Sequence, residues 1–223
     1  MTSSNQREFK RRLGDGGMLF KGLVLAAGMS KRMGSFKPLM KVNEHTLIEN
    51  SIHSLLEAQV EHIVLVVGYR GEEIEALFDQ QKSIREKLTI VYNPYYEQSE
   101  MLDSVKIGLS YLDKCDGFFL LPGDMPAVSK NTFVQLKKAF KSGSIVFPTI
   151  ENHRKHPPLI GDSYKDEILK YQSNQGLRGF WELKRENIVE IPVLDKGCDL
   201  DMDTKTQFDN LCRYMTQKGS YCL

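Results

Sequence analysis

Short apolar runs alternate with amphipathic stretches over most of this chain, and this alternation restricts the fold more than any other feature. The apolar runs are rich in Val, Ile, Leu and Phe and are followed by turn-forming residues such as Gly, Asn and Pro. Strands buried on both faces have this composition, and helical stretches between them are typical of repeated β–α–β units. The predicted strands are residues 23–27, 63–67, 88–92, 118–121, 144–147 and 188–192. The predicted helices are residues 47–58, 72–78, 101–112, 130–140 with Ser129 as N-cap, 164–171, 176–184 and 205–215.

This order of elements indicates an α/β fold in which helices cover both faces of a mostly parallel central sheet, a Rossmann-like three-layer sandwich. In such sheets, ligands bind beyond the carboxyl ends of the strands. We therefore expect the functional residues in the loops that follow Ala27, Val67, Tyr92 and Leu121.

Composition and charge exclude several other classes of protein. The 223 residues suit one domain, which we place at residues 18–223 behind a flexible N-terminal tail at residues 1–17. The tail lacks the apolar core of a secretion signal. A formal net charge of +1 provides no basic field for nucleic acid, and no run approaches the ~18 apolar residues of a membrane span. The four cysteines form no CxxC pair, which predicts reduced thiols in a cytoplasmic protein.

A glycine-containing basic loop with the sequence GMSKRMGSFK directly follows the first predicted strand. Gly28 and Gly34 let the backbone approach a ligand closely, and successive backbone N–H groups in such a loop bind anions. Lys31, Arg32 and Lys37 add positive charge, and the Arg32 guanidinium suits a phosphate held by two parallel hydrogen bonds. The spacing matches neither the P-loop nor the GxGxxG dinucleotide motif. The loop therefore predicts polyphosphate binding of another kind, with a solvated basic turn as the alternative.

Asp124 follows the fourth predicted strand within the sequence LPGDMP. Its carboxylate is expected to face the same crevice as the basic loop, on a backbone that the flanking prolines stiffen. Magnesium binds to proteins through one or two carboxylates together with substrate phosphates. Asp124 is therefore a candidate magnesium ligand, although an ordinary Gly-Asp turn has the same sequence.

Asp199, Asp201 and Asp203 alternate along the segment that precedes the last predicted helix. In an extended segment their side chains point the same way, and their mutual repulsion is relieved by a cation. The pattern predicts that at least one of them binds a metal ion. Capping is the competing interpretation, because Asp203 or Thr204 suits the N-cap of that helix, and one residue can cap while another binds metal.

Taken together and in this order, these segments resemble the nucleotidyltransferases that complete the molybdenum cofactor. The signature LAAGxSxRMGxxK of that family matches residues 25–37 without departure, GDxP matches residues 123–126, and DxDT matches residues 201–204. Two further segments, at residues 156–160 and 174–178, are similar to its GHPVLF and DxGAR segments. The resemblance covers roughly residues 20–211 and points to the cytidylyltransferase branch.

The resemblance implies a fold of the nucleotide-diphospho-sugar transferase type and a reaction that depends on Mg²⁺. In that reaction the phosphate of a molybdopterin-type cofactor attacks the α-phosphorus of CTP, and pyrophosphate leaves. Magnesium would be bound by Asp124 and Asp203, with Asp201 as a further ligand. Lys37, Arg32 and Asp124 are the catalytic residues implied, with Lys37 at the α-phosphate and Arg32 at the β- and γ-phosphates.

The same resemblance implies two binding regions and the molecules that occupy them. The implied nucleotide-binding residues are Leu25, Ala26, Ala27, Gly28, Ser30, Arg32, Gly34, Lys37 and Gly123. The implied acceptor-binding residues are His156, Arg178 and, in the loop at residues 98–104, Ser104. The partners are CTP or GTP, the molybdopterin-type cofactor, and a molybdoenzyme or its maturation factor. This chain departs from the family on the acceptor side, at Lys155, Pro158 and Asn174.

Two different functions remain compatible with these residues. In the first, the chain transfers GMP or another nucleotide to a different phosphorylated small molecule. In the second, it is a carrier or insertion chaperone that binds the finished cofactor and delivers it to a molybdoenzyme. Turnover distinguishes them, because a carrier binds its ligand without releasing pyrophosphate.

Overall fold

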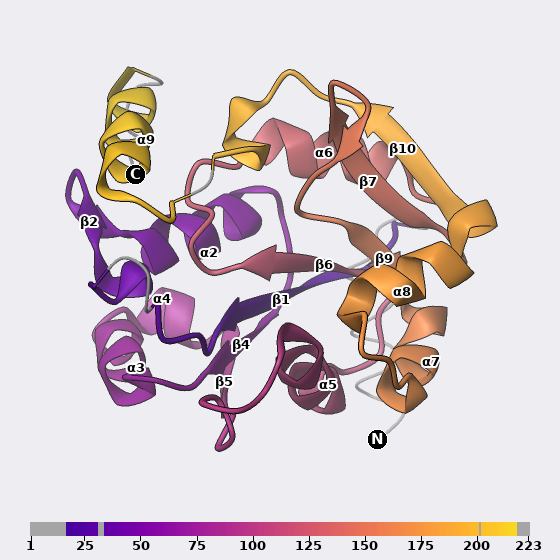
Figure 1. Cartoon of the computed structure of the whole chain (residues 1–223), viewed down its shortest axis with the longest axis horizontal. Coiled ribbons are helices and arrows are strands. Elements are labelled where there is room, and N and C mark those ends of the chain that lie inside the picture. The colour runs from indigo at the N-terminus through magenta and orange to yellow at the C-terminus, as the bar shows by residue number, and fades with distance from the viewer. Residues whose placement is uncertain (1–16, 31–33, 201, 218–223) are drawn as a thin grey trace.

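A single large sheet crosses the middle of the molecule in the computed structural model, which describes residues 17–30, 34–200 and 202–217. Within these residues the sheet has eight strands in the order β10-β7-β9-β6-β1-β4-β5, with β8 paired to β7 (Figure 1). Its strands are β1 (Phe20–Ala26), β4 (Ile63–Val67), β5 (Leu88–Tyr92), β6 (Gly117–Pro122), β7 (Ile145–Ile150), β8 (His153–Arg154), β9 (Leu159–Gly161) and β10 (Ile188–Pro192). A separate hairpin joins β2 (Lys41–Val42) to β3 (His45–Thr46).

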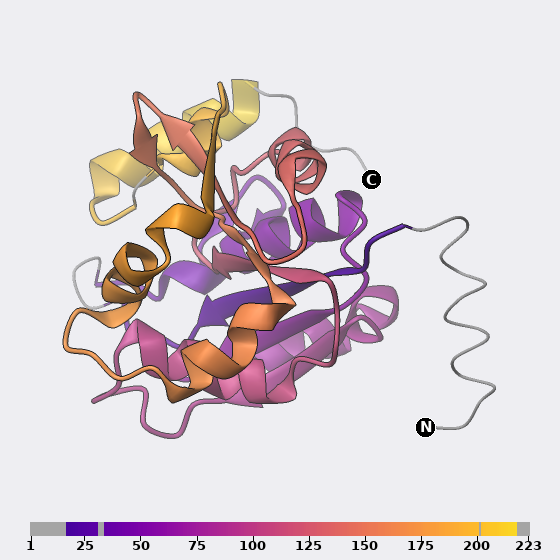
Figure 2. The same ribbon diagram turned by 90° about the vertical axis from the view of Figure 1, so that its right-hand side faces the viewer.

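Helices cover both faces of the sheet, as Figure 1 and Figure 2 show from two directions. The α-helices are α2 (Leu47–Glu57), α3 (Gly71–Asp79), α4 (Lys82–Arg85), α5 (Met101–Tyr111), α6 (Lys130–Ala139), α7 (Lys165–Lys170), α8 (Gly176–Leu183) and α9 (Lys205–Gln217). Short 3₁₀ helices are η2 (Lys37–Leu39), η3 (Asp162–Tyr164), η4 (Arg185–Asn187) and η5 (Lys196–Cys198). The core residues place α2, α3 and α6 on one face and α5, α7 and α8 on the other. The predicted three-layer α/β sandwich is therefore confirmed.

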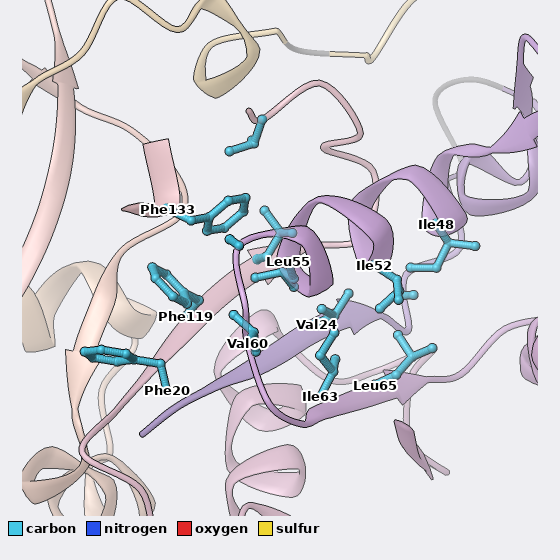
Figure 3. Close-up of a cluster of buried hydrophobic side chains, with 14 of the residues drawn as sticks. Phe20, Val24, Ile48, Ile52, Leu55, Val60, Ile63, Leu65, Phe119 and Phe133 are labelled. Atoms are coloured by element: carbon cyan, nitrogen blue, oxygen red, sulfur yellow. The ribbon is translucent and has the colours of Figure 1, made fainter. Parts of the chain in front are cut away.

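Residues that alternate along the central strands point into two different cores. On one face, Val24 and Leu65 pack with Ile48, Ile52 and Leu55 of α2, as Figure 3 shows. On the opposite face the intervening strand residues pack against α5, and they include Leu23, Val64, Val66 and Leu120. All these side chains are fully buried. This two-sided burial explains why the strands form continuous apolar runs rather than alternating ones.

The parallel strands of the central sheet end at the same edge. β1 pairs in parallel with β4 and β6, and β4 pairs in parallel with β5. The register aligns Ala26 with Val67 and Val67 with Tyr92, while Leu25 lies opposite Pro122. The loops after these strands therefore gather at one place, as expected for the ligand-binding edge of an α/β sheet.

Strand β9 was missed by the sequence prediction. It inserts antiparallel between β6 and β7, through pairs such as Phe119 with Leu159 and Ile145 with Ile160. With three residues after two prolines, it is too short for a periodicity signal. The sheet is consequently mixed, with a parallel central part.

The N-terminal cap of α6 also differs from the prediction. Ser129 occupies the N-cap position, but its side chain makes no capping hydrogen bond. The Asp195 carboxylate instead accepts from the Ser129 backbone N–H and from the Thr132 hydroxyl, both at 2.7 Å. A cap from a residue so distant in sequence leaves no local signal.

Helix α9 packs beside β2 and away from the main sheet (Figure 1). Leu211 and Met215 of this helix bury against Val42 and Leu47. Its N-terminus is capped by Thr204, whose hydroxyl accepts from the Gln207 N–H at 3.3 Å. Of the two residues predicted as candidates for the cap, Thr204 is therefore the one that caps the helix. The Asp203 carboxylate is left for another partner.

None of the described helices is long and apolar enough to cross a membrane.

The carboxylate of Glu49 fastens the start of α2. It accepts from the Thr46 N–H at 2.7 Å and from the Gln81 amide at 2.7 Å, while Thr46 Oγ1 accepts from the Glu49 N–H at 3.3 Å. Burial acts to raise the pKa of Glu49, but the hydrogen bonds from Thr46 and Gln81 outweigh it and hold the pKa below the usual 4.5. A lowered pKa means that the ionised carboxylate is favoured by the folded state.

We expect Glu49→Gln to lower the free energy of unfolding by about 1–2 kcal/mol at pH 7, because a charged hydrogen-bond acceptor is lost. The stabilisation by Glu49 is present above its unfolded pKa and is lost as the pH falls through the lower, folded value. Urea unfolding of both proteins should therefore converge as the pH falls below 4.5. A difference that stays constant with pH would show that the charge of Glu49 does not stabilise the helix.

Candidate functional site

One pocket of about 250 Å³ opens where β1, β5 and β6 end. Its walls come from the end of β1, from the start of η2, from the loop between β5 and α5, and from the turn after β6. The residues predicted for the site that line this pocket are Leu25, Ala26, Ala27, Gly28, Ser30, Lys37, Ser104 and Asp124. Gly34 lines a neighbouring hollow of about 500 Å³ that shares Ser30 with the pocket. Segments far apart in the sequence thus form one concave surface.

Lys37 lies between two carboxylates at one end of this pocket. Its ammonium Nζ is 2.8 Å from Asp203 Oδ1 and 3.4 Å from Asp124 Oδ2. The lysine residue is only 8% exposed, whereas both carboxylates are partly exposed. The buried cation therefore has its charge balanced from two sides by residues that also face solvent.

Local structure fixes the position of Lys37. It begins the 3₁₀ helix η2, with Pro38 in the first turn, and its backbone N–H donates to Ser30 Oγ at 3.2 Å. Proline suits this position because its φ is already helical and it needs no N–H partner there. This hydrogen bond joins Ser30 of the basic loop to Lys37, the lysine that the sequence predicts to be catalytic.

The two carboxylates could together bind a divalent cation. Both approach the same ammonium nitrogen, so a cation at that position would have an oxygen ligand on each side. The described residues contain no group of three or more His, Cys, Asp or Glu side chains able to hold a metal. Two carboxylates, completed by phosphate oxygens and water, are the ligand set typical of magnesium rather than of a structural zinc.

Gly123 permits close packing directly before Asp124. Its N–H donates to Leu25 O at 2.8 Å, and an added Cβ would lie 2.8 Å from Ile48 Cδ1 and 3.1 Å from Ala26 Cβ. A side chain here would push the turn away from β1. Gly123 does not line the described pocket, and its close packing holds the turn that carries Asp124 against β1. Its predicted role in nucleotide binding stays a prediction.

The loop between β5 and α5 contributes more to the pocket than the sequence prediction recognised. Tyr96, Ser99, Glu100 and Met101 line it in addition to Ser104. Tyr96 packs so closely on Gly68 that an added Cβ there would lie 2.6 Å from Tyr96 Cβ. The sequence signal was the position of this loop after a predicted strand, but no motif identified the individual side chains.

Of the acceptor-side candidates, His156 lies near the metal candidates and Arg178 does not line the described pocket. Burial lowers the pKa of His156, against the opposing effects of a hydrogen bond with the Leu120 backbone and of the nearby Asp124 charge. His156 Nδ1 is buried without a hydrogen-bond partner among the described residues. Arg178 is an exposed residue of α8. His156 therefore lies close enough to Asp124 to feel its charge, but it does not line the described pocket either.

Asp199 pairs with Lys155, outside the Lys37 cluster. The alternating acids are thus divided between two lysines, since Asp203 pairs with Lys37. Arg32, Lys31 and Asp201 lie outside the described residues, and so does most of the predicted N-terminal tail at residues 1–17. Their predicted roles stay predictions.

Comparison with known proteins gives consistent matches. The family model of the MobA-like NTP transferase domain matches residues 22–188. The molybdenum cofactor cytidylyltransferase of Escherichia coli K12 is 33% identical over 186 residues, 83% of this chain and 92% of that protein. A probable molybdenum cofactor guanylyltransferase of Bacillus cereus Q1 is 31% identical over 139 residues, 62% of this chain and 65% of that protein. Among solved structures, a nucleotidyl transferase from Methanothermobacter thermautotroptrophicus has a TM-score of 0.78 at 17% identity, covering 91% of this chain and all of that one.

Without the Lys37 ammonium between them, the Asp124 and Asp203 carboxylates should repel each other. We expect Lys37→Met to lower the free energy of unfolding by about 1–2 kcal/mol in EDTA, because two half-exposed charges lose their partner. Millimolar Mn²⁺ or Mg²⁺ should then stabilise the variant more than the wild type, as measured by the shift in Tm.

The matched control is Lys155→Met, which frees Asp199 alone. Its Tm should respond to Mn²⁺ as the wild type does. An equal response of all three proteins would show that Asp124 and Asp203 do not form a cation site.

Proposed function

The chain belongs to the family of MobA-like NTP transferase domains, and from this premise we propose that it transfers CMP from CTP to the phosphate of a molybdopterin-type cofactor. Pyrophosphate is the second product. The observation that carries the proposal is the position of Lys37 between Asp124 and Asp203, at one end of a pocket walled by the end of β1. This is where charge must be neutralised when a bond to the α-phosphorus is exchanged.

Asp124 and Asp203 are the proposed ligands of Mg²⁺. Held there, the ion would supply positive charge that offsets the negative charge of the reacting phosphates. In the structure the Lys37 ammonium pairs with the same two carboxylates, and its single positive charge offsets only one of their two negative charges. In the proposed reaction the Lys37 ammonium would donate hydrogen bonds to the α-phosphate oxygens and stabilise the negative charge that develops during transfer.

The basic loop is the proposed site of the leaving pyrophosphate. Gly28 lines the pocket, and a Cβ added to it would meet no atom within 4 Å, so its backbone borders open space. Ser30 joins this backbone to Lys37 and lines both hollows. The β- and γ-phosphates would therefore extend from Lys37 along residues 28–34, with Arg32 as a further cation.

The acceptor is proposed to approach from the side of His156. A phosphate monoester has a second pKa of about 6 and is ionised at neutral pH, so no protein base has to activate it. The unpaired, buried Nδ1 of His156 supports this side as polar, although His156 itself does not line the described pocket. Ser104, by contrast, lies in the pocket with Leu25, Ala26 and Ala27, which favours contact with the nucleotide over the acceptor role predicted from the sequence.

The choice of CTP as donor rests on the relatives. The cytidylyltransferase relative aligns over more of this chain than the guanylyltransferase relative does. GTP is the competing donor, and it would require no change of fold or mechanism. Transfer to a different phosphorylated acceptor, or delivery of a finished cofactor without any transfer, would also use a pocket at this edge, so the test has to separate these functions.

Pyrophosphate release is the direct test. The purified chain with Mg²⁺ should release pyrophosphate from CTP only when molybdopterin is added, and the product should be the cytidine dinucleotide of the cofactor. Release of pyrophosphate from GTP instead would show that GTP is the nucleotide donor. Binding of the cofactor without release from any triphosphate would contradict the proposal and favour a carrier.

Asp124→Asn should lower kcat by about 100-fold or more, since removing one stabilising group from a transfer site has effects of this size. Its near-isosteric side chain should leave Tm almost unchanged. Asp199→Asn is the matched control, because Asp199 pairs with Lys155 and not with Lys37. Equal activity of the two variants in the pyrophosphate assay would remove Asp124 from the mechanism.

A further inference from the structure

Asn93 is a buried polar residue at the ligand-binding edge for which the proposed reaction has no direct use. It follows β5 directly, is 1% exposed, and donates its backbone N–H to Val67 O at 2.8 Å. Its side chain lies under the loop that forms one wall of the pocket. A fully buried amide needs partners for both its oxygen and its nitrogen.

The orientation of the Asn93 amide follows from its neighbours. The Tyr95 backbone N–H donates to Asn93 Oδ1 at 2.9 Å, and only the oxygen of the amide can accept that bond. Nδ2 therefore faces the other way, where it donates to Ser99 Oγ at 2.8 Å and to Ser104 Oγ at 3.0 Å. Both hydrogens of the amide nitrogen are thus used.

This arrangement sets the hydrogen-bonding direction of two serines. Each hydroxyl oxygen accepts from Asn93, so each keeps its own hydrogen for another partner. Neither hydroxyl donates a hydrogen bond within the described part of the chain, and both residues line the pocket. The two serine Oγ atoms lie 2.8 and 3.0 Å from the same Asn93 nitrogen, so they are within about 6 Å of each other. The pocket wall therefore presents two neighbouring donors.

A carboxylate adjoins these donors. Glu100 lies between Ser99 and the start of α5, lines the same pocket and has an exposed side chain. A carboxylate only accepts hydrogen bonds. The wall at residues 99–104 thus offers two donors and one acceptor to the same pocket that Lys37 and Asp124 line.

We propose that Asn93 makes this site selective for cytosine by holding the Ser99 and Ser104 hydroxyls as donors, with Glu100 as the acceptor. This inference rests on the proposed function, because it takes the occupant of the pocket to be the nucleotide whose phosphates Lys37 and Asp124 would contact. Cytosine has two adjacent acceptors, O2 and N3, beside the N4 amino donor. The wall is complementary to that order.

Other bases do not match. The Watson–Crick edge of guanine has donors at N1 and N2, which would oppose both serine hydroxyls, and uracil has a donor at N3 and an acceptor facing Glu100. Guanine has two adjacent acceptors, O6 and N7, only on its Hoogsteen edge. That edge carries no amino group that could donate to Glu100. Unpaired polar groups in a site reject the wrong ligand more strongly than matched ones favour the right ligand.

Equilibrium binding of CTP, GTP and UTP with Mg²⁺ and without acceptor tests the proposal by calorimetry. The wild type should bind CTP at least tenfold more tightly than GTP or UTP. Asn93→Asp keeps the bond from the Tyr95 N–H but replaces the donor nitrogen with an acceptor, so the serine hydrogens turn towards it. The ratio of GTP to CTP dissociation constants should then fall at least tenfold.

Further variants keep the test informative if the buried Asn93→Asp does not fold. Ser99→Ala and Ser104→Ala should each weaken CTP binding by roughly tenfold, the size of one hydrogen bond, and leave GTP binding nearly unchanged. Glu100→Ala should reduce the preference for CTP over UTP. Ser110→Ala is the matched control, because this exposed serine of α5 bonds to Lys106 O and not to Asn93.

The outcomes separate this inference from the proposed function. Equal wild-type affinity for CTP and GTP, or unchanged ratios in the serine and Asn93 variants, would overturn the role of Asn93 and leave nucleotidyl transfer intact. Failure of the wild type to bind any triphosphate would overturn both.

Discussion

The common alignment of the parallel strands β1, β4, β5 and β6 is the constraint on which the rest of the structure depends. Because their two faces are buried by different sets of helices, a shift of one residue would exchange the two cores, and the register is therefore fixed. With the register fixed, the residues after these strands meet at one edge: the basic loop, Gly68, Asn93 and the turn with Asp124. The site is thus a result of how the core packs, and its precision comes from buried Val, Ile and Leu rather than from the loops.

Two polar arrangements use that edge in different ways. The buried Lys37 ammonium pairs with two partly exposed carboxylates, Asp124 and Asp203, and groups arranged in this way can exchange partners with a bound ligand. Asn93, by contrast, is buried with both ends of its amide occupied, which suits a residue that keeps its partners. Under the proposed function, the exchangeable charges would serve the chemistry and the fixed hydrogen-bond pattern would serve recognition.

Much of this was predictable from the sequence, and the reasons differ from element to element. The strands were predicted because their apolar runs are continuous, and Lys37 and Asp124 because they follow strands within specific motifs. Strand β9 was missed because three residues after two prolines carry no periodicity. The Asp195 cap of α6 and the bonds from Asn93 to Ser99 and Ser104 were missed because ordinary polar residues acquire their partners only through tertiary contact. The separation of Asp199 from Asp203 was also missed, since their alternation predicted that the side chains would point the same way.

The ion pair between Lys37 and Asp203 joins residues that are 166 positions apart. The two residues are therefore synthesised at well-separated times. The N-terminal strands and the basic loop leave the ribosome long before the acidic segment that completes the cluster, so a nascent chain can bury its sheet while Lys37 still lacks this partner. Completion of the cluster therefore depends on α9, whose docking against β2 and α2 holds the preceding Asp203 carboxylate at Lys37.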